Sequence, residues 1–139
     1  MTEYKIFIDT SPYIYYLERN PQYYVRTMKY FIDKYDKGNI FFTSAITIEE
    51  YSVIPYRENN TELLNDFKVL LIAMETEIVD ITQSIADKAA QIRAQYNGFK
   101  PMDALQLAAA VESKCDLFLT NDKQLRQFTG IKVLTMEDI

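Results

Sequence analysis

The segment that decides the fold is Lys5-Ile6-Phe7-Ile8-Asp9-Thr10-Ser11-Pro12, a short apolar run that ends in an acidic residue. The β-branched and aromatic side chains over residues 5–8 predict a strand. Ser11 and Pro12 are typical of a helix cap and a first helical residue, so a helix is expected directly after this strand. A strand that passes straight into a helix is the basic unit of an α/β fold.

The same alternation continues along the rest of the chain. Gly38 and Asn97-Gly98 mark two helix ends, and Pro101 marks the start of a helix rich in alanine and leucine. The connections between strands are too long for hairpins, which implies parallel pairing with crossover helices. The sequence therefore predicts a three-layer α/β/α sandwich around an open, mostly parallel five-stranded sheet. Its further strands are expected over residues 40–43, 78–81, 117–120 and 132–134, and its main helices over 21–37, 61–75, 85–96 and 101–114.

Composition restricts the chemistry that the chain can perform. With 139 residues, 48% of them hydrophobic and 25% charged, and no repeat or linker, the sequence indicates one globular domain over residues 1–139. The chain has no histidine and a single cysteine, Cys115. This excludes zinc fingers, Ser-His-Asp hydrolases and histidine-based metalloproteases. Carboxylates remain as the groups for acid, base or metal chemistry.

Charge and hydropathy bear on partners and location. Fifteen basic and twenty acidic residues give a net charge of −5, which argues against a purely electrostatic binder of nucleic acid. The longest strongly apolar segment, residues 69–74, is too short to span a membrane. Residues 1–9 lack the basic and apolar regions of a signal peptide. We therefore expect a cytoplasmic protein without membrane contact.

Acidic residues are expected at the carboxyl edge of the sheet, where open α/β sheets place their reactive crevice. Asp9 and Asp122 follow the first and fourth predicted strands, and Asp103 lies in the first turn of the alanine-rich helix. In the helix after the second strand, Glu49 and Glu50 face different sides, and their spacing does not choose between them. Each acid also has a purely structural interpretation, as a turn residue or as an acid that favours a helix start.

The segment after the fourth strand carries further candidate residues. Asn121 is expected to cap the following helix, with Gln124 as its partner three residues later. Lys123 and Arg126 share that helix with Asp122 and could guide phosphates, although ordinary solvated side chains are the default interpretation.

Carboxylates that converge in one crevice repel each other and raise each other's pKa unless a cation lies among them. An all-oxygen set without histidine or thiolate suits Mg²⁺ or Mn²⁺. Such an ion can turn water into a nucleophile and neutralise a phosphodiester oxygen. The residues thus predict a magnesium or manganese site.

Four ordered segments of the chain resemble a known family. In this order and spacing they are similar to the PIN-domain ribonucleases, in particular to the small VapC-like toxins of type II toxin–antitoxin systems. The segments are IFIDTSPYIYYLE (6–18), TSAITIEEY (43–51), KPMDALQLAAAV (100–111) and DLFLTNDKQLRQF (116–128).

The resemblance implies a function and assigns roles. It selects Glu50 over Glu49, because in the family pattern the second acid follows a serine by six positions and a threonine by three. It implies a metal-dependent endoribonuclease that hydrolyses RNA phosphodiester bonds, plausible as a toxin, with a homodimer and a small antitoxin as partner. A non-catalytic PIN-like module that binds RNA or protein is the alternative. The implied metal ligands are Asp9, Glu50, Asp103 and Asp122, with Thr10 and Asn121 orienting ligands or water.

Overall fold

The computed structural model describes residues 4–139 and contains a five-stranded sheet in the order β3-β2-β1-β4-β5. Every neighbouring pair is parallel, so the predicted sheet is confirmed and is parallel throughout. Residues 1–3, part of the stretch considered for a signal peptide, lie outside the described residues. The strands are β1 (Lys5–Ile8), β2 (Ile40–Ser44), β3 (Glu77–Val79), β4 (Leu117–Leu119) and β5 (Lys132–Leu134).

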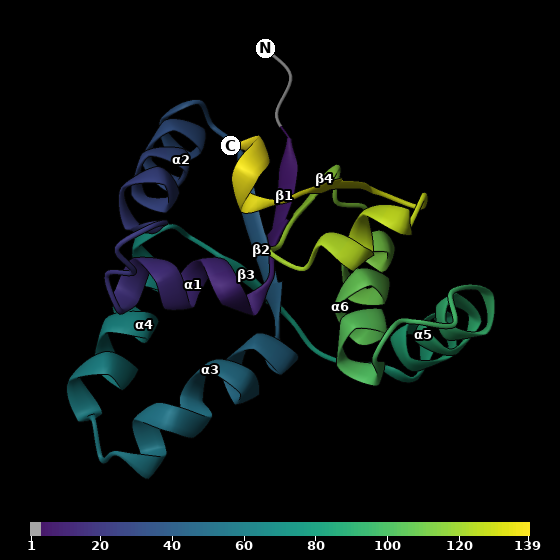
Figure 1. Ribbon diagram of the computed structural model, residues 1–139, viewed down its shortest axis with the longest axis horizontal. Helices are drawn as coiled ribbons and strands as arrows, with labels where there is room; N and C mark the ends of the chain where they lie inside the picture. Colours follow the sequence, from purple (N-terminus) through teal and green to yellow (C-terminus); the bar gives the residue numbers. More distant parts are fainter. Residues whose placement is uncertain (1–3) are drawn as a thin grey trace.

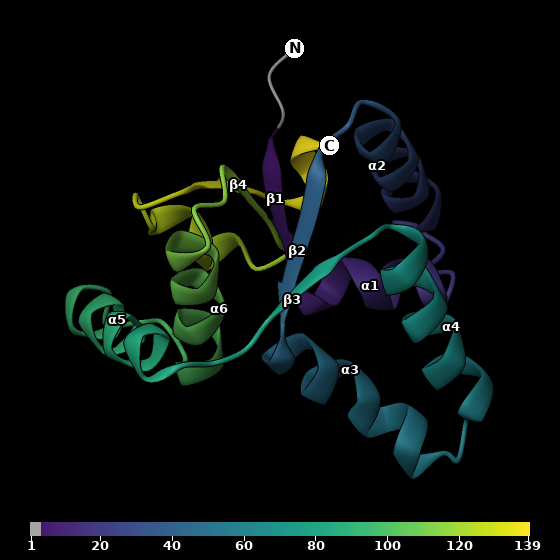
Figure 2. The same ribbon diagram turned by 180° about the vertical axis from the view of Figure 1, so that it is seen from behind.

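Helices cover both faces of the sheet, as Figure 1 shows, which confirms the three-layer architecture. One face carries α1 (Thr10–Leu17), α2 (Tyr24–Asp36), α3 (Ala45–Arg57) and α4 (Thr61–Ala73); the other carries α5 (Gln83–Gln95) and α6 (Pro101–Glu112). The view from behind shows that α5 and α6 lie next to each other and cover one face of the sheet (Figure 2). Two short 3-10 helices follow, η1 (Lys123–Gln127) and η2 (Met136–Asp138). Across residues 4–139, none of the helices has both the length and the apolar character needed to cross a bilayer.

Three predicted boundaries are wrong for local reasons. α1 begins at Thr10 with Asp9 as its cap, so Ser11 and Pro12 lie inside the helix. α2 begins at Tyr24 instead of residue 21. The side-chain oxygen of Asn20 accepts hydrogen bonds from the backbone N–H groups of Gln22 and Tyr23, and these bonds hold a turn before the helix. After β4 the chain forms a 3-10 helix capped by Asp122, so Asn121 is not the cap.

The central strand fills two cores at once. Ile6 and Ile8 point into the core under α1, α2 and α4, whereas Phe7 points into the core under α5 and α6. This is the period of two that a strand imposes on its side chains. Phe7 stacks on Phe118 of β4 with ring centroids 5.3 Å apart, which joins β1 and β4 under α6.

The strand order reverses beside β1. From β1 the chain adds β2 and β3 on one side, and then crosses to add β4 and β5 on the other side. The carboxyl ends of β1 and β4 are therefore the switch point, where open α/β sheets are expected to place their reactive crevice. β1 and β2 end at the same edge of the sheet, where α1, α3 and α6 begin (Figure 1).

Candidate active site

Asp9 lies at the carboxyl end of β1 and is held by three hydrogen bonds. Its side chain is only 9% exposed. Oδ1 accepts the backbone N–H of Thr10 (2.8 Å), which caps α1, and the Nε2 of Gln106 (3.1 Å). Oδ2 accepts the hydroxyl of Thr120 (2.8 Å), the residue after β4. These bonds fix the orientation of the carboxylate at the switch point.

Glu50 reaches the same place from α3. Its Oε1 accepts a hydrogen bond of 2.7 Å from the Thr10 hydroxyl, so Thr10 connects the two carboxylates that the resemblance assigns. Glu49 lies on a different side of α3, where it lines a groove between α3 and α4. The geometry therefore places Glu50, and not Glu49, in contact with Thr10, the residue that follows Asp9.

Asp103 and Asp122 complete the group of four acids. Asp103 is half-buried in the first turn of α6, and burial together with the charges of Asp9 and Asp122 raises the pKa of its carboxyl. Burial also raises the pKa of Asp9, and the charge of Glu50 adds to that effect. The four side chains come from four distant segments. The charge of Glu50 acts on Asp9, and the charges of Asp9 and Asp122 act on Asp103.

The four acids do not enclose a metal ion in their described positions. Among residues 4–139, no three acidic, histidine or cysteine side chains gather closely enough to hold one. Glu50 is bonded to Thr10, and Oδ1 of Asp122 accepts the backbone N–H of Gln124 at 3.0 Å. Carboxylates of like charge repel one another. The donor set itself, four carboxylates without histidine or thiolate, fits Mg²⁺ or Mn²⁺.

Sequence reasoning missed Gln106, which lies one turn after Asp103 on α6. Its side chain is 1% exposed, and its amide donates to Asp9 and also to the hydroxyl of Thr47 (2.7 Å). The amide oxygen accepts the hydroxyl of Ser44. One signal was available, because Gln106 is the only polar side chain from Ala104 to Ala110 in a helix of alanine and leucine.

The residues expected to orient ligands or substrate have different surroundings. The Nδ2 of Asn121 donates to the hydroxyl of Tyr15 (2.8 Å). Lys123 forms an ion pair with Glu137 (2.8 Å), and Arg126 forms one with Asp138 (3.2 Å). Both cations are thus bonded to the last turn of the chain and not to the four carboxylates.

Comparison with known proteins assigns the chain to a family. A family model described as the PIN domain matches residues 6–131, which includes all four acids. The chain belongs to the PIN domain family. No curated protein sequence matches it significantly.

Solved structures share this PIN fold over almost the whole chain. VapBC2 from Rickettsia felis, bound to a DNA fragment from its promoter, has a TM-score of 0.73 at 15% identity and covers 94% of this chain and 98% of its own. A toxin–antitoxin complex from Klebsiella pneumoniae has a TM-score of 0.70 at 20% identity, with 96% and 99% covered. VapC20 of Mycobacterium tuberculosis, described as a toxin that cleaves the sarcin–ricin loop, has a TM-score of 0.71 at 12% identity, with 91% and 98% covered.

The raised carboxyl pKa values predict how the metal-free PIN domain responds to pH. A folded-state pKa above the ordinary 3.8 means that folded Asp103 keeps its proton where the unfolded chain has lost it. The contribution of this group to stability is therefore present below pH 3.8 and is lost as the pH rises through the folded-state pKa. In chelator, the melting temperature of Asp103→Asn should rise relative to the unsubstituted protein between pH 4 and pH 7. A constant difference across these pH values would contradict the assignment.

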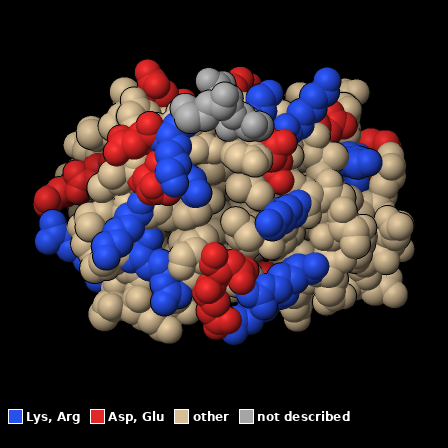
Figure 3. Space-filling model, turned by 90° about the horizontal axis from the view of Figure 1, so that it is seen from above, with Lys and Arg blue, Asp and Glu red and all other residues tan. Residues whose placement is uncertain are grey.

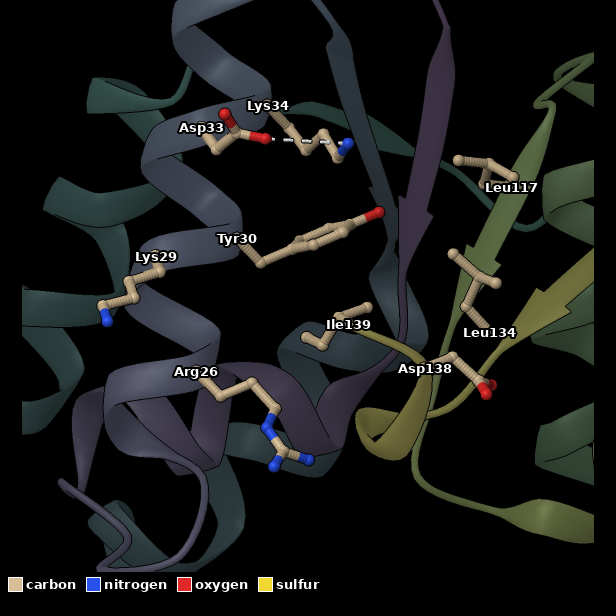
Figure 4. A pocket seen from close by; sticks show the side chains of 9 residues that line it. All are labelled: Arg26, Lys29, Tyr30, Asp33, Lys34, Leu117, Leu134, Asp138 and Ile139. Carbon is tan, nitrogen blue, oxygen red and sulfur yellow. Dashed lines mark ion pairs between the residues drawn. The ribbon is translucent and has the colours of Figure 1, made fainter.

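A pocket lies away from the acids. It has a volume of about 490 Å³ and opens between α2 and the Leu117 and Leu134 side chains of β4 and β5 (Figure 4), and none of the four candidate carboxylates lines it. Two of its cations are engaged within the fold, since Lys34 pairs with Asp33 (3.7 Å) and Arg26 donates to the carbonyl of Met136 (2.7 Å). At the amino-terminal end of the strands, basic and acidic side chains are mixed on the surface (Figure 3). Neither feature competes with the crevice as a reactive site.

Proposed function

We propose that this PIN domain is a Mg²⁺- or Mn²⁺-dependent endoribonuclease that serves as the toxin of a toxin–antitoxin pair. The observation that supports the proposal most is the electrostatic coupling of acids from four segments at the switch point, with Asp9 and Asp103 both raised in pKa. The resemblance of the fold to toxins, one of them described as cleaving the sarcin–ricin loop, supports the choice of substrate class.

Each acid has a distinct contribution in this proposal. Asp9 is the fixed ligand, because three hydrogen bonds hold it. Glu50 comes from the second turn of α3, Asp103 from the first turn of α6, and Asp122 from the segment after β4. The bound ion would supply a nucleophilic water and neutralise charge on the scissile phosphate. Thr10 orients Glu50 through its hydroxyl. Asn121 is proposed to orient ligands or water because it is adjacent to Asp122 in the chain.

Lys123 and Arg126 have a narrower role in the proposal. Their ion pairs are solvent-exposed, so either side chain can exchange its carboxylate partner for an RNA phosphate at little cost. They would add affinity for the backbone of the RNA without reading its sequence.

Exposed apolar side chains support a protein partner. Large apolar side chains on α2, α3 and α4 are 53–77% exposed, and uncovered apolar surface marks interaction sites where it is contiguous. We propose that these helices bind a small antitoxin. A homodimer is also proposed, and light scattering of the purified protein tests it. The exposed side chains are Val25, Ile32, Ile54, Tyr56, Val69 and Ile72.

Two neighbouring glutamates offer a matched test of the nuclease. The purified protein should cut mixed RNA when Mn²⁺ is present and not when it is chelated. Glu50→Gln should lower the rate at least about tenfold, because it removes one ionised ligand. Glu49→Gln, the same chemical change on another side of α3, should cut at the unsubstituted rate. Gel electrophoresis of labelled RNA measures both variants.

The RNA cleavage assay distinguishes the nuclease from the non-catalytic alternative. RNA binding without cutting in Mn²⁺ would favour the non-catalytic PIN-like module. Equal loss of rate in both variants would contradict the placement of Glu50.

A further inference from the structure

Gln106 places a polar amide in a buried position of α6 where an apolar side chain would be expected. It is 1% exposed on the face of α6 that otherwise presents alanine and leucine to the sheet. Burying an amide is unfavourable unless every polar atom finds a partner. An apolar side chain here would continue the pattern of Leu107 and its alanine neighbours, which are fully buried. The reason for the amide therefore lies in the groups that it contacts.

Both ends of the amide are engaged, and the contacts fix which end faces Asp9. The Ser44 hydroxyl accepts the backbone N–H of Ile46 (3.1 Å) and donates its single proton to Oε1 of Gln106. The NH₂ group is thereby turned to the other side, where it donates to Oδ1 of Asp9 (3.1 Å) and to Thr47 (2.7 Å). The amide cannot flip without losing these bonds.

These contacts connect the elements that carry three of the four acids. Ser44 caps α3 and Thr47 lies in its first turn, and α3 carries Glu50. Gln106 itself lies one turn from Asp103 on α6, and it binds Asp9 at the end of β1. A single side chain thus ties the end of β1, the start of α3 and the start of α6 to one another.

We propose that Gln106 is a positioning residue that fixes the Asp9 carboxylate, and with it the spacing of the acids, for binding of the divalent cation; this rests on the proposed function. A carboxylate offers about four acceptor sites. The bonds from Thr10 and Gln106 use both sites of Oδ1, and the bond from Thr120 uses one site of Oδ2. The site that remains free is on Oδ2, so Gln106 decides which oxygen of Asp9 is available to the ion.

An uncharged amide suits this task better than the other side chains of similar size. A lysine at this position would neutralise Asp9 and compete with the cation, and a glutamate would add a further negative charge against Asp9. A methionine would fill the space but leave Oδ1 of Asp9 and the hydroxyls of Ser44 and Thr47 without this partner. Only an amide accepts from Ser44 and donates to Asp9 without changing the charge of the site.

The test measures Mn²⁺ binding directly, with no RNA present. Free Mn²⁺ is followed by electron paramagnetic resonance while the purified protein is titrated, well below its melting temperature. Gln106→Met should bind Mn²⁺ about 10 to 100 times more weakly, which is the usual effect of removing a group that orients a metal ligand. Cleavage of RNA by this variant should return when Mn²⁺ is raised by the same factor. Loss of a ligand such as Glu50 should not be rescued in this way.

Thr27→Val serves as the matched control. Thr27 is also fully buried and donates one hydrogen bond, to the carbonyl of Tyr23, the residue before α2 (2.8 Å). This variant loses a buried polar contact away from the acids, so its Mn²⁺ affinity should equal that of the unsubstituted protein. If Gln106→Met does not fold, Gln106→Asn replaces it, because its amide is one methylene too short to reach both Ser44 and Asp9, and the same loss of affinity is expected.

The outcomes distinguish this inference from the proposed function. If the unsubstituted protein binds Mn²⁺ and the Gln106 variant binds it equally well, the positioning role is wrong and the nuclease proposal stands. If Thr27→Val loses as much affinity as the Gln106 variant, the effect is one of general stability and the positioning role is again wrong. If the unsubstituted protein neither binds Mn²⁺ nor cuts RNA, the proposed function fails and the inference fails with it.

Discussion

Replacing Asp103 with asparagine is expected to reduce Mn²⁺-dependent cleavage of RNA by about a hundredfold or more. A metal ligand in a hydrolytic site contributes several kcal/mol to stabilising the transition state, and each 1.4 kcal/mol is about tenfold in rate. Asp103 has a raised pKa through burial and through the charges of Asp9 and Asp122, so it lies within the field of the other candidate ligands. A cleavage assay at saturating RNA measures the loss.

The same substitution should leave the metal-free protein at least as stable as before. Asparagine keeps the shape of the side chain and removes one of the charges that repel each other at the crevice. In chelator at pH 7, the melting temperature should therefore be equal or higher. Asp87→Asn, on the exposed side of α5, is the control and should change neither cleavage nor melting. Cleavage at the unsubstituted rate by Asp103→Asn would contradict the proposed site.

Phe118→Ala is expected to produce the largest loss of stability, about 3–5 kcal/mol. The Phe118 ring is completely buried in β4 and stacks on Phe7 of the central strand. Its removal leaves a cavity under α6 between the two strands that border the crevice. For a chain of this length the melting temperature should fall by roughly 10–20 °C, as measured by thermal unfolding followed by circular dichroism.

An exposed apolar residue provides the comparison for Phe118. Ile72 on α4 is 77% exposed, so Ile72→Ala should change the free energy of unfolding by less than about 0.5 kcal/mol. A loss of less than about 1 kcal/mol in Phe118→Ala would show that the pairing of β1 and β4 does not depend on this stack.

Much of the fold could be predicted because its signals are local. The apolar run of β1, the glycine after α2 and the proline at the start of α6 each act within a few residues, and they predicted β1, the end of α2 and the start of α6 correctly. Besides the three boundaries that local capping decides, one error arose where a tertiary contact decides. β3 ends at Val79, and Ile81, which was expected to extend the strand, packs partly buried against the core under α5 and α6.

The candidate site could be predicted only as far as it follows from the topology. Acids after β1 and β4 must lie at the same edge of a parallel sheet, so Asp9 and Asp122 could be found from their places in the sequence. The partners of Gln106 could not, because they come from the end of β1 and the start of α3, which only the folded chain brings to α6. The ion pairs of Lys123 and Arg126 depend likewise on the return of the chain end to η1.

The two outer strands have a consequence for how the protein behaves when it accumulates. β3 and β5 are only three residues long, so each border of the sheet offers few free backbone groups to an incoming strand. Short outer strands are a known protection against the stacking of chains into fibrils. When many copies of this protein accumulate in a cell, we therefore expect little fibril formation through the edges of the sheet.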